Sequence, residues 1–524
     1  MMLLLQDRRV RCLLTMAALV HLLLATSFHL SPDETQYTLY SAHIAWSYFD
    51  HPPLVGWLQW PWGALGGSDL LMRVVPMTSW LLGAVGVMGV TAALYPEASA
   101  SENTFPSLTA PFFALLLWAL SPIPHLLGVA LVPDTLLMPI TCASLYFCWQ
   151  LCDARQLQRL PLWLGLGACL GLAGLSKYTA ILIGLGAVLA LLLSHGPRLL
   201  VLRGAWLAVA LAGLLISPVI LWNATHNWIS FAYQFGHAAG TADWRISRVM
   251  AFGVVQILGY GVLLLVGVVV AWRLRAGGAP GRRLSPVAFS LCFGLPALLL
   301  LTYLSGRGST LPHWSTSAWM ALVPAAAAGC QALWLHSRKM RRTLTALGVF
   351  QAVACVGLAG LMLAGGVSSE VGEQARSQPG QVSEDSKFNP FADLYGWDVA
   401  AQQGRVLAEK HKNNQGIQPT LAVFNWTLAS RMAWYARPLG VKVVQRHFDQ
   451  FGLWWGVLQP GESTLLVDWS QMSFAPPVGP GQFERCELLA QLPVHRMGRQ
   501  IAHFNYLLCH NWQGPLDPSL GRSN

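Results

Sequence analysis

Over the first 366 residues, long apolar runs alternate with short loops that are charged or rich in Pro and Gly. A helix needs about 20 mostly apolar residues to cross a bilayer. Runs near this length lie at 12–30, 70–94, 133–152, 177–195, 204–222, 249–272, 286–304, 315–335 and 343–366. Two shorter runs, 107–121 and 161–175, are also expected to span, because the alternation of loop charge requires them; the segment 122–132 is too short and too Pro-rich to span alone. The pattern predicts a mostly α polytopic membrane protein with about 11 transmembrane helices.

Beyond residue 366 the chain becomes more polar and its elements become shorter. The segment 370–390 is polar and punctuated by Pro and Gly, as in a linker. Helices are predicted at 396–412 and 427–436, and strands at 420–424, 442–445 and 464–470. We therefore expect a transmembrane domain over 1–366 and a small C-terminal α/β domain over 367–524.

The basic residues of the loops fix the expected orientation. With the N-terminus in the cytoplasm, nearly every basic cluster falls inside, as the positive-inside rule requires. The loops 31–69, 223–248 and 305–314 and the C-terminal domain then lie outside. The first apolar run follows a basic segment, as in a signal peptide, but it is long enough to remain as an uncleaved anchor. These features predict a multi-pass protein of a bacterial inner membrane with its C-terminal domain in the periplasm.

Composition supports the membrane class and excludes others. The chain is 54% hydrophobic and 11% charged, whereas soluble domains carry about 25% charged residues. The net charge of +10 is explained by the inner loops, and no basic face or module motif in the sequence points to nucleic-acid binding. Cys486 and Cys509 are the two cysteines of the polar C-terminal part. In an oxidising compartment they would form a disulfide, and the alternative is two buried thiols.

The first outer loop contains the densest acidic cluster, SPDETQYTLYSAHIAWSYFDHPPL at 31–54. Asp33 and Glu34 directly follow the first apolar run, where charged groups are rarely placed without a function. The alternative for Asp33 is a plain N-cap of the helix that follows. Asp50 and His51 precede two prolines, which hold the preceding residue extended and so predict a rigid turn.

Further charged residues lie at the outer ends of the apolar runs. Asp134, Lys177, Arg307 and His313 are all expected on the outer side. The same positions also hold the lone basic residues Arg73, Arg245 and Arg248. Basic residues on the outer side run against the positive-inside rule, so topology does not explain them. They either extend toward lipid phosphates or converge on an anionic ligand. A set of carboxylates, basic residues and histidines suits a reaction with a phosphate leaving group and a hydroxyl that loses its proton.

Several segments carry a resemblance to a known family. Besides the first loop, these are PDTLLM, GLAGLSKYTA, LPHWSTSAW, ADLYGWDVAA, FNWTLASRMAWYARP, DQFGLWWG and FNYLLCHNWQG. They resemble segments of bacterial membrane glycosyltransferases related to dolichyl-phosphate-mannose–protein mannosyltransferases, which share the GT-C fold. The lipid A aminoarabinose transferases are more distant relatives, and the C-terminal part departs from their larger ectodomain.

The resemblance implies transfer of a sugar from a polyprenyl-phosphate carrier to a lipid, polysaccharide or protein acceptor. It implies Asp33 as general base, with Glu34 as the alternate, and Lys177 and Arg307 as the residues that hold the carrier phosphate. The expected substrate-binding residues are Asp50, His51, Asp134, Lys177, Tyr178, Arg245, Arg307 and His313. The resemblance makes no cofactor certain, and a divalent metal is possible. A divalent metal would find Asp50 with His51 or His237 as candidate ligands, without a fixed spacing.

The loops give an independent argument about the donor. Every inner loop has about 13 residues or fewer, so none forms a cytoplasmic domain that would hold a nucleotide sugar. A donor used on the outer side must then arrive attached to lipid. Three alternatives stay open: a ligase or polymerase of polyprenyl-diphosphate glycans, a transporter or flippase, and a non-catalytic assembly subunit.

Overall fold

The protein is described by a computed structural model that covers residues 2–96, 109–239, 243–274, 282–308, 310–366, 389–412, 416–444 and 449–514. The chain forms two compact units. The first comprises Met1–Ala25, Ala45–Leu58 and Leu70–Gly357, and the second comprises Thr26–Ile44, Gln59–Asp69 and Leu358–Asn524. Two pieces of the first outer loop thus belong to the same unit as the C-terminal domain. Most of the predicted linker 370–390 lies outside the described residues.

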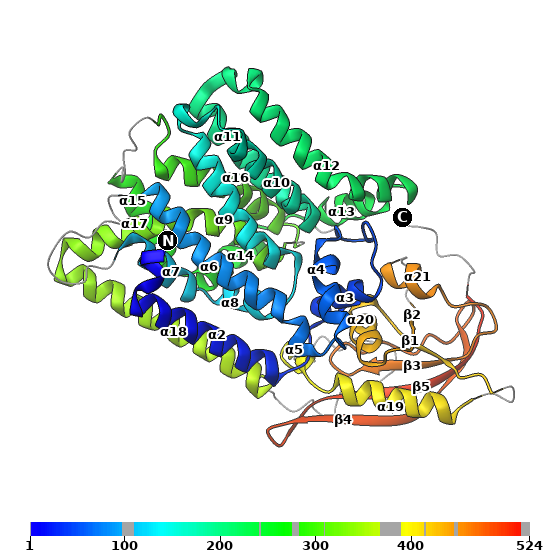
Figure 1. Ribbon diagram of the computed structural model, residues 1–524. Coiled ribbons are helices and arrows are strands. Elements are labelled where there is room, and N and C mark those ends of the chain that lie inside the picture. Colours follow the sequence, from blue (N-terminus) through cyan, green and yellow to red (C-terminus); the bar gives the residue numbers. More distant parts are fainter. Residues whose placement is uncertain are drawn as a thin grey trace. The chain divides into compact units, whose positions relative to one another are not determined.

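Most of the chain is helical (Figure 1). The helices up to residue 366 are α1 (Met2–Gln6), α2 (Arg8–Ser27), α3 (Pro32–Ala42), α4 (Leu54–Ala64), α5 (Asp69–Met72), α6 (Val74–Leu94), α7 (Ala110–Ala119), α8 (Pro122–Val129), α9 (Pro133–Leu151), α10 (Leu160–Ser176), α11 (Ile181–His195), α12 (Arg203–Thr225), α13 (Ile229–Ala239), α14 (Ile246–Tyr260), α15 (Val262–Arg273), α16 (Pro286–Ser305), α17 (Thr316–His336) and α18 (Arg338–Ala364). The C-terminal part adds α19 (Trp397–Lys410), α20 (Trp426–Tyr435), α21 (Gln450–Trp455), β1 (Thr420–Val423), β2 (Val441–Val443), β3 (Thr464–Trp469), β4 (Phe483–Arg496) and β5 (Arg499–Trp512).

The core of the first unit is built around α17, which packs against α6, α7, α9, α15 and α16. Its middle is a run of small residues, 325–329, that lets neighbouring backbones approach closely. A Cβ atom on Gly329 would overlap the carbonyl of Gly267 in α15. Helix–helix contact at this point therefore depends on glycine, as is common where helices pack within a membrane.

The predicted count of 11 transmembrane helices is not confirmed. Among the described residues, 7 helices are long and apolar enough to cross a membrane, or 9 if each of two bent pairs counts as one span. The predicted helix at 249–272 is broken at Gly261, which has a φ of 94°, so that α14 and α15 meet at 91°. Similarly, α7 and α8 meet at 70° where Pro122 begins a new helix. Hydropathy shows that such runs are apolar but does not show where they bend.

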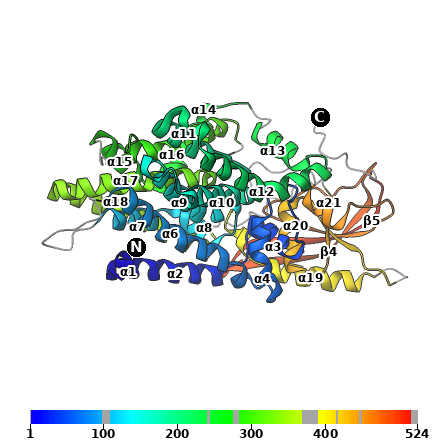
Figure 2. The same cartoon turned by 45° about the horizontal axis from the view of Figure 1, so that its top comes forward.

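The second unit contains a five-stranded sheet in the order β2-β1-β3-β5-β4. β1 runs parallel to β2 and β3, whereas β5 runs antiparallel to β3 and β4. Helices α19 and α20 pack against the parallel strands, and α3 packs against α20 (Figures 1 and 2). The predicted helices and strands of this part are confirmed as α19, α20, β1, β2 and β3.

The long hairpin of β4 and β5, together with α21, was not predicted from the sequence. Much of β4 is exposed, so its apolar residues do not alternate clearly with polar ones. Cys486 and Cys509 face each other across β4 and β5 and form a disulfide. Of the two alternatives for these cysteines, the disulfide is therefore confirmed.

Candidate functional site

Asp33 and Asp134 occupy the same local position in their helices. Each follows a proline that is the first residue of a helix, α3 in one case and α9 in the other. Proline is favoured at this position because its ring already has the helical φ and its missing N–H leaves no bond unmade. The positive end of the helix dipole stabilises a negative charge in the first turn. Both aspartates therefore lie in the first turn of a helix, at the positive end of its dipole.

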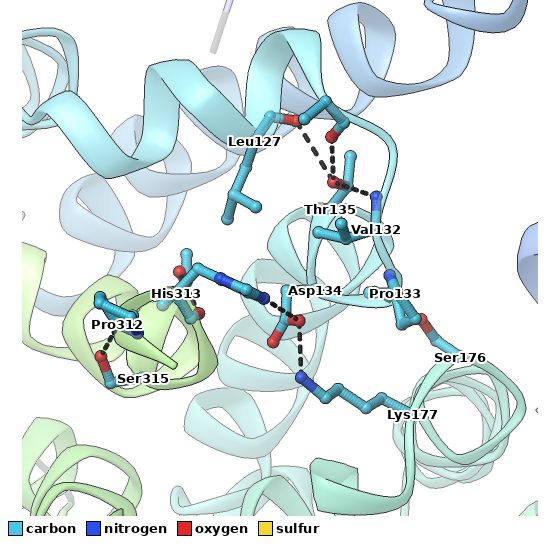
Figure 3. A network of polar contacts seen from close by, with 12 residues as sticks. Leu127, Val132, Pro133, Asp134, Thr135, Ser176, Lys177, Pro312, His313 and Ser315 are labelled. Carbon is cyan, nitrogen blue, oxygen red and sulfur yellow. Dashed lines mark hydrogen bonds and ion pairs between the residues drawn. The ribbon is translucent and has the colours of Figure 1, made fainter. Parts of the chain in front are cut away.

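In the first unit, Asp134 forms a buried ion pair with Lys177 (Figure 3). The Lys177 Nζ lies 2.6 Å from the Asp134 Oδ2, and the two side chains are only 6% and 3% exposed. His313 approaches the same oxygen, with its Nε2 at 3.5 Å. The Lys177 ammonium also lies 4.9 Å from the centre of the Trp314 ring. Three of the predicted site residues are thus brought together by the fold.

The backbone explains how Lys177 reaches Asp134. Lys177 follows the last residue of α10 and has an extended conformation, with φ −154° and ψ 142°. The neighbouring Ser176 donates its hydroxyl to the Pro133 carbonyl at 2.7 Å, which ties the end of α10 to the start of α9. A buried ion pair must be well bonded because desolvation of the two charges is costly. The ammonium has three donors, of which the bond to Asp134 occupies one.

A second polar group fixes the turn that carries His313. The side-chain oxygen of Gln256 accepts hydrogen bonds from the Ser315 hydroxyl (2.5 Å) and the Trp319 indole (2.6 Å). Its amide donates to the Pro312 carbonyl at 3.0 Å. Gln256 holds the turn from which His313 projects, and our sequence reasoning missed it. The signal was a lone amide within the apolar run 249–272.

The turn with Asp50 and His51 is held by α13, also in the first unit. The Tyr48 N–H donates to the His51 carbonyl at 3.0 Å, which closes the turn. The Ser230 hydroxyl donates to the Tyr48 carbonyl (2.8 Å), and the Gln234 amide donates to the Asp50 carbonyl (2.5 Å). A well-held turn agrees with the two prolines that follow His51.

Two further predicted residues can be placed near this turn. Tyr178, which follows Lys177, interacts electrostatically with Asp50 and packs its ring against Phe231 at 5.3 Å. The side chain of His237 lies outside the described residues. Across the described part of the chain, no group of three or more His, Cys, Asp or Glu side chains is arranged to hold a metal ion.

The outer basic residues differ in their surroundings. Arg245 and Arg307 are both exposed, at the start of α14 and after α16. Their segments meet at Gly306, whose carbonyl accepts from the Arg245 N–H at 2.9 Å. Arg248 donates to the Asp243 carbonyl at 3.0 Å. By contrast, Arg73 is fully buried and donates to the carbonyl of Ala25 at 2.8 Å, so neither lipid phosphate nor a free ligand explains its position.

In the second unit, Glu34 rather than Asp33 caps α3. The N-cap residue is Ser31, and its N–H donates to the Glu34 Oε2 at 2.9 Å. The alternative of Asp33 as a plain N-cap is therefore wrong, because Asp33 is the second residue of the helix. Glu34 is buried and engaged in capping, whereas Asp33 is partly exposed.

Arg431, on α20, is a residue of this unit that the sequence reasoning missed. It is 1% exposed, forms an ion pair with Asp393, and lies over the rings of Trp397 and Trp469 at 3.9 and 5.2 Å. Burial lowers the pKa of its guanidinium, and the nearby negative charge of Asp33 acts in the opposite direction. The signal in the sequence was a single Arg inside the apolar helix TLASRMAWYA.

The predicted site residues thus fall into groups. Asp134, Lys177 and His313 are in contact, and Asp50 lies near Tyr178, all in the first unit. Asp33 and Glu34 belong to the second unit. The convergence of Asp33 with Lys177 and Arg307 in one pocket stays a prediction.

Parts of this chain are similar in sequence to known proteins. Residues 50–222 match the family model of dolichyl-phosphate-mannose-protein mannosyltransferases. The lipid A galacturonosyltransferase RgtD of Rhizobium johnstonii is 26% identical over 308 residues, which are 57% of this chain. The match spans 59% of the length of that relative.

Two solved structures are similar over nearly the whole chain. ArnT from Cupriavidus metallidurans in the apo state has a TM-score of 0.61 at 15% identity, covering 95% of this chain and 97% of that one. The same protein bound to undecaprenyl phosphate has a TM-score of 0.62 at 16% identity, with the same coverage. The resemblance inferred from the sequence is thereby confirmed: the chain is a multi-pass membrane protein with the GT-C fold, and it is similar to bacterial GT-C membrane glycosyltransferases.

Proposed function

We propose that the protein moves a sugar from a polyprenyl-phosphate-linked donor to an acceptor of the cell envelope, on the periplasmic face of the inner membrane. The observation that carries this proposal is the buried pair of Asp134 and Lys177. It lies at helix ends within residues 50–222, the part that matches the mannosyltransferase family model. Ionisable groups buried in a membrane domain are costly and usually serve a function. The likeness to a structure that binds undecaprenyl phosphate supports the donor class.

The proposed chemistry assigns a task to each charged group. Asp33 accepts the proton of the acceptor hydroxyl, whose oxygen then attacks the anomeric carbon of the donor sugar. The bond between that carbon and the phosphate oxygen breaks, and the polyprenyl phosphate leaves with the electron pair. Lys177 and Arg307 stabilise the charge that develops on the phosphate. This effect is strongest where water is excluded, as it is around the buried Lys177. Attack opposite the leaving group inverts the anomeric configuration.

Two measurements test this function. Mass spectrometry of the glycolipids of a deletion strain and its parent identifies the sugar and the acceptor. The purified protein in detergent is then assayed for transfer from the corresponding lipid-linked donor. Transfer without a membrane between compartments distinguishes an enzyme from a flippase. An unchanged glycolipid profile in the deletion strain, together with no transfer by the purified protein, would refute the proposed function.

The role of Asp33 has a matched control in the same unit. Asp398 is also the second residue of its helix, α19, and is exposed. Because a positioned base contributes about 10²–10⁴ in rate, Asp33→Asn should lower transfer by at least about 100-fold, whereas Asp398→Asn should leave it unchanged. Near-normal transfer by Asp33→Asn would remove Asp33 from this role.

A further inference from the structure

The buried guanidinium of Arg431 is a charge that the proposed reaction does not use directly. Moving a charge from water into a protein interior is costly unless partners compensate it. Arg431 pairs with Asp393, stacks on Trp397 and Trp469, and donates from its Nε to the Thr427 carbonyl at 3.1 Å. These contacts hold the guanidinium plane in one orientation.

The same elements hold the residues that lead into α3. One turn after Arg431 on α20, the Tyr435 hydroxyl accepts from the Leu30 N–H at 2.8 Å and donates to the Asp69 Oδ2 at 2.7 Å. Beside Asp393, the carbonyl of Leu394 accepts from the His29 N–H at 3.0 Å. Both Arg431 and its partner Asp393 therefore lie on elements bonded to the segment just before Asp33. Helix α3 packs on α20, and the negative charge of Asp33 acts on the guanidinium of Arg431.

We propose that Arg431 is a positioning residue that keeps the Asp33 carboxylate ionised and correctly oriented. This inference rests on the proposed function, in which Asp33 is the general base. A nearby cation stabilises the charged form of a carboxylate. Arg suits this task because its planar fork binds carboxylates in a fixed geometry and keeps its charge where Lys would lose it. Asp393 and Asp33 share one cation, so the charge of Asp393 limits how strongly Arg431 acts on Asp33.

The pH profile of transfer tests the proposal, because an ordinary structural role would not shift it. In Arg431→Gln, Asp33 would need a higher pH to ionise, so the acid limb of kcat/KM should move up by about 1–2 pH units. The loss of rate should be about 10-fold or more at pH 5 and should largely disappear at alkaline pH. In Asp393→Asn the competing carboxylate is gone, and the acid limb should move to lower pH.

The chain offers a matched control for loss of an arginine. Arg437 follows α20, lies 3.3 Å over the Trp434 ring, and interacts electrostatically with Asp69 and Tyr435. Arg437→Gln should leave the acid limb where it is in the wild type. If Arg431→Gln does not fold, because it leaves Asp393 unpaired, a double variant with Arg431→Met and Asp393→Leu removes both charges. That variant should also move the acid limb upward, but by less than Arg431→Gln, because the negative charge of Asp393 is gone as well.

The outcomes separate this inference from the proposed function. An active wild type whose acid limb is unmoved in Arg431→Gln, or in the double variant, would overturn the positioning role. A shift of the same size in Arg437→Gln would also overturn it, because the effect would not be specific to Arg431. A wild type that transfers no sugar from any lipid-linked donor would refute the proposed function instead.

Discussion

Replacing Lys177 by Met should destabilise the membrane domain, because it leaves Asp134 buried without its main partner. The Asp134 side chain is 3% exposed and its carboxylate lies 2.6 Å from the ammonium, so water cannot replace the lost cation. Removing one partner of a buried ion pair lowers the stability of a protein by about 3–5 kcal/mol. His313, at 3.5 Å, recovers part of this only when it is protonated.

A double variant separates the structural contribution of the pair from its function. With Lys177→Met and Asp134→Leu together, no buried charge remains, and replacing a buried pair with apolar residues of similar volume is often neutral or stabilising. The double variant should therefore recover most of the lost stability. It should remain inactive, because the cation proposed to bind phosphate is absent.

The assay is thermal unfolding in detergent, followed by tryptophan fluorescence, together with transfer activity. The control is Lys442→Met, which breaks a pair with Glu462 of similar length (2.8 Å) whose side chains are each 17% exposed. Exposed ion pairs contribute only about 0–1 kcal/mol to stability. Because the pair of Lys442 and Glu462 is more accessible, Lys442→Met should lower the free energy of unfolding clearly less than Lys177→Met does. A double variant as unstable as Lys177→Met, or a Lys177→Met protein as stable as the wild type, would refute the reasoning.

Two further predictions concern packing and pH. Gly329→Ala should strongly lower the melting temperature, because the new Cβ would overlap the backbone of α15, whereas Gly213→Ala on α12, where a Cβ meets open space, should not; equal melting temperatures for the two variants would contradict the packing. Burial raises the pKa of Asp468 from 3.8 to about 6, so the folded state binds its proton more tightly than the unfolded state does. The stabilisation is complete below about pH 4 and is lost as pH rises to about 6, a loss of about 3 kcal/mol. The melting temperature of the C-terminal unit should therefore fall between pH 4 and pH 7, and Asp468→Asn should reduce this fall. If the melting temperature of the variant depends on pH as steeply as that of the wild type, another group controls the fall.

The sequence predicted much of the architecture because the deciding signals are local. Apolar runs of membrane-spanning length identified the helical domain, and short alternating elements identified α19, α20 and β1 to β3. The hairpin of β4 and β5 was missed because its exposed residues carry no clear period. The count of 11 helices is not confirmed, because bends such as that at Gly261 depend on how neighbouring helices pack, which hydropathy does not record.

For the site, the sequence by itself identified the unusual residues, and only the tertiary structure decided how they pair. Asp33, Asp134 and Lys177 stood out because a charge beside an apolar run is costly. The pairing of Asp134 with Lys177 and the burial of Arg431 between Asp393 and two tryptophans join segments far apart in the chain. Such contacts arise when buried charges must find partners during packing. The partner of a buried charge is fixed by the three-dimensional arrangement of helices, and neighbouring sequence carries little information about it.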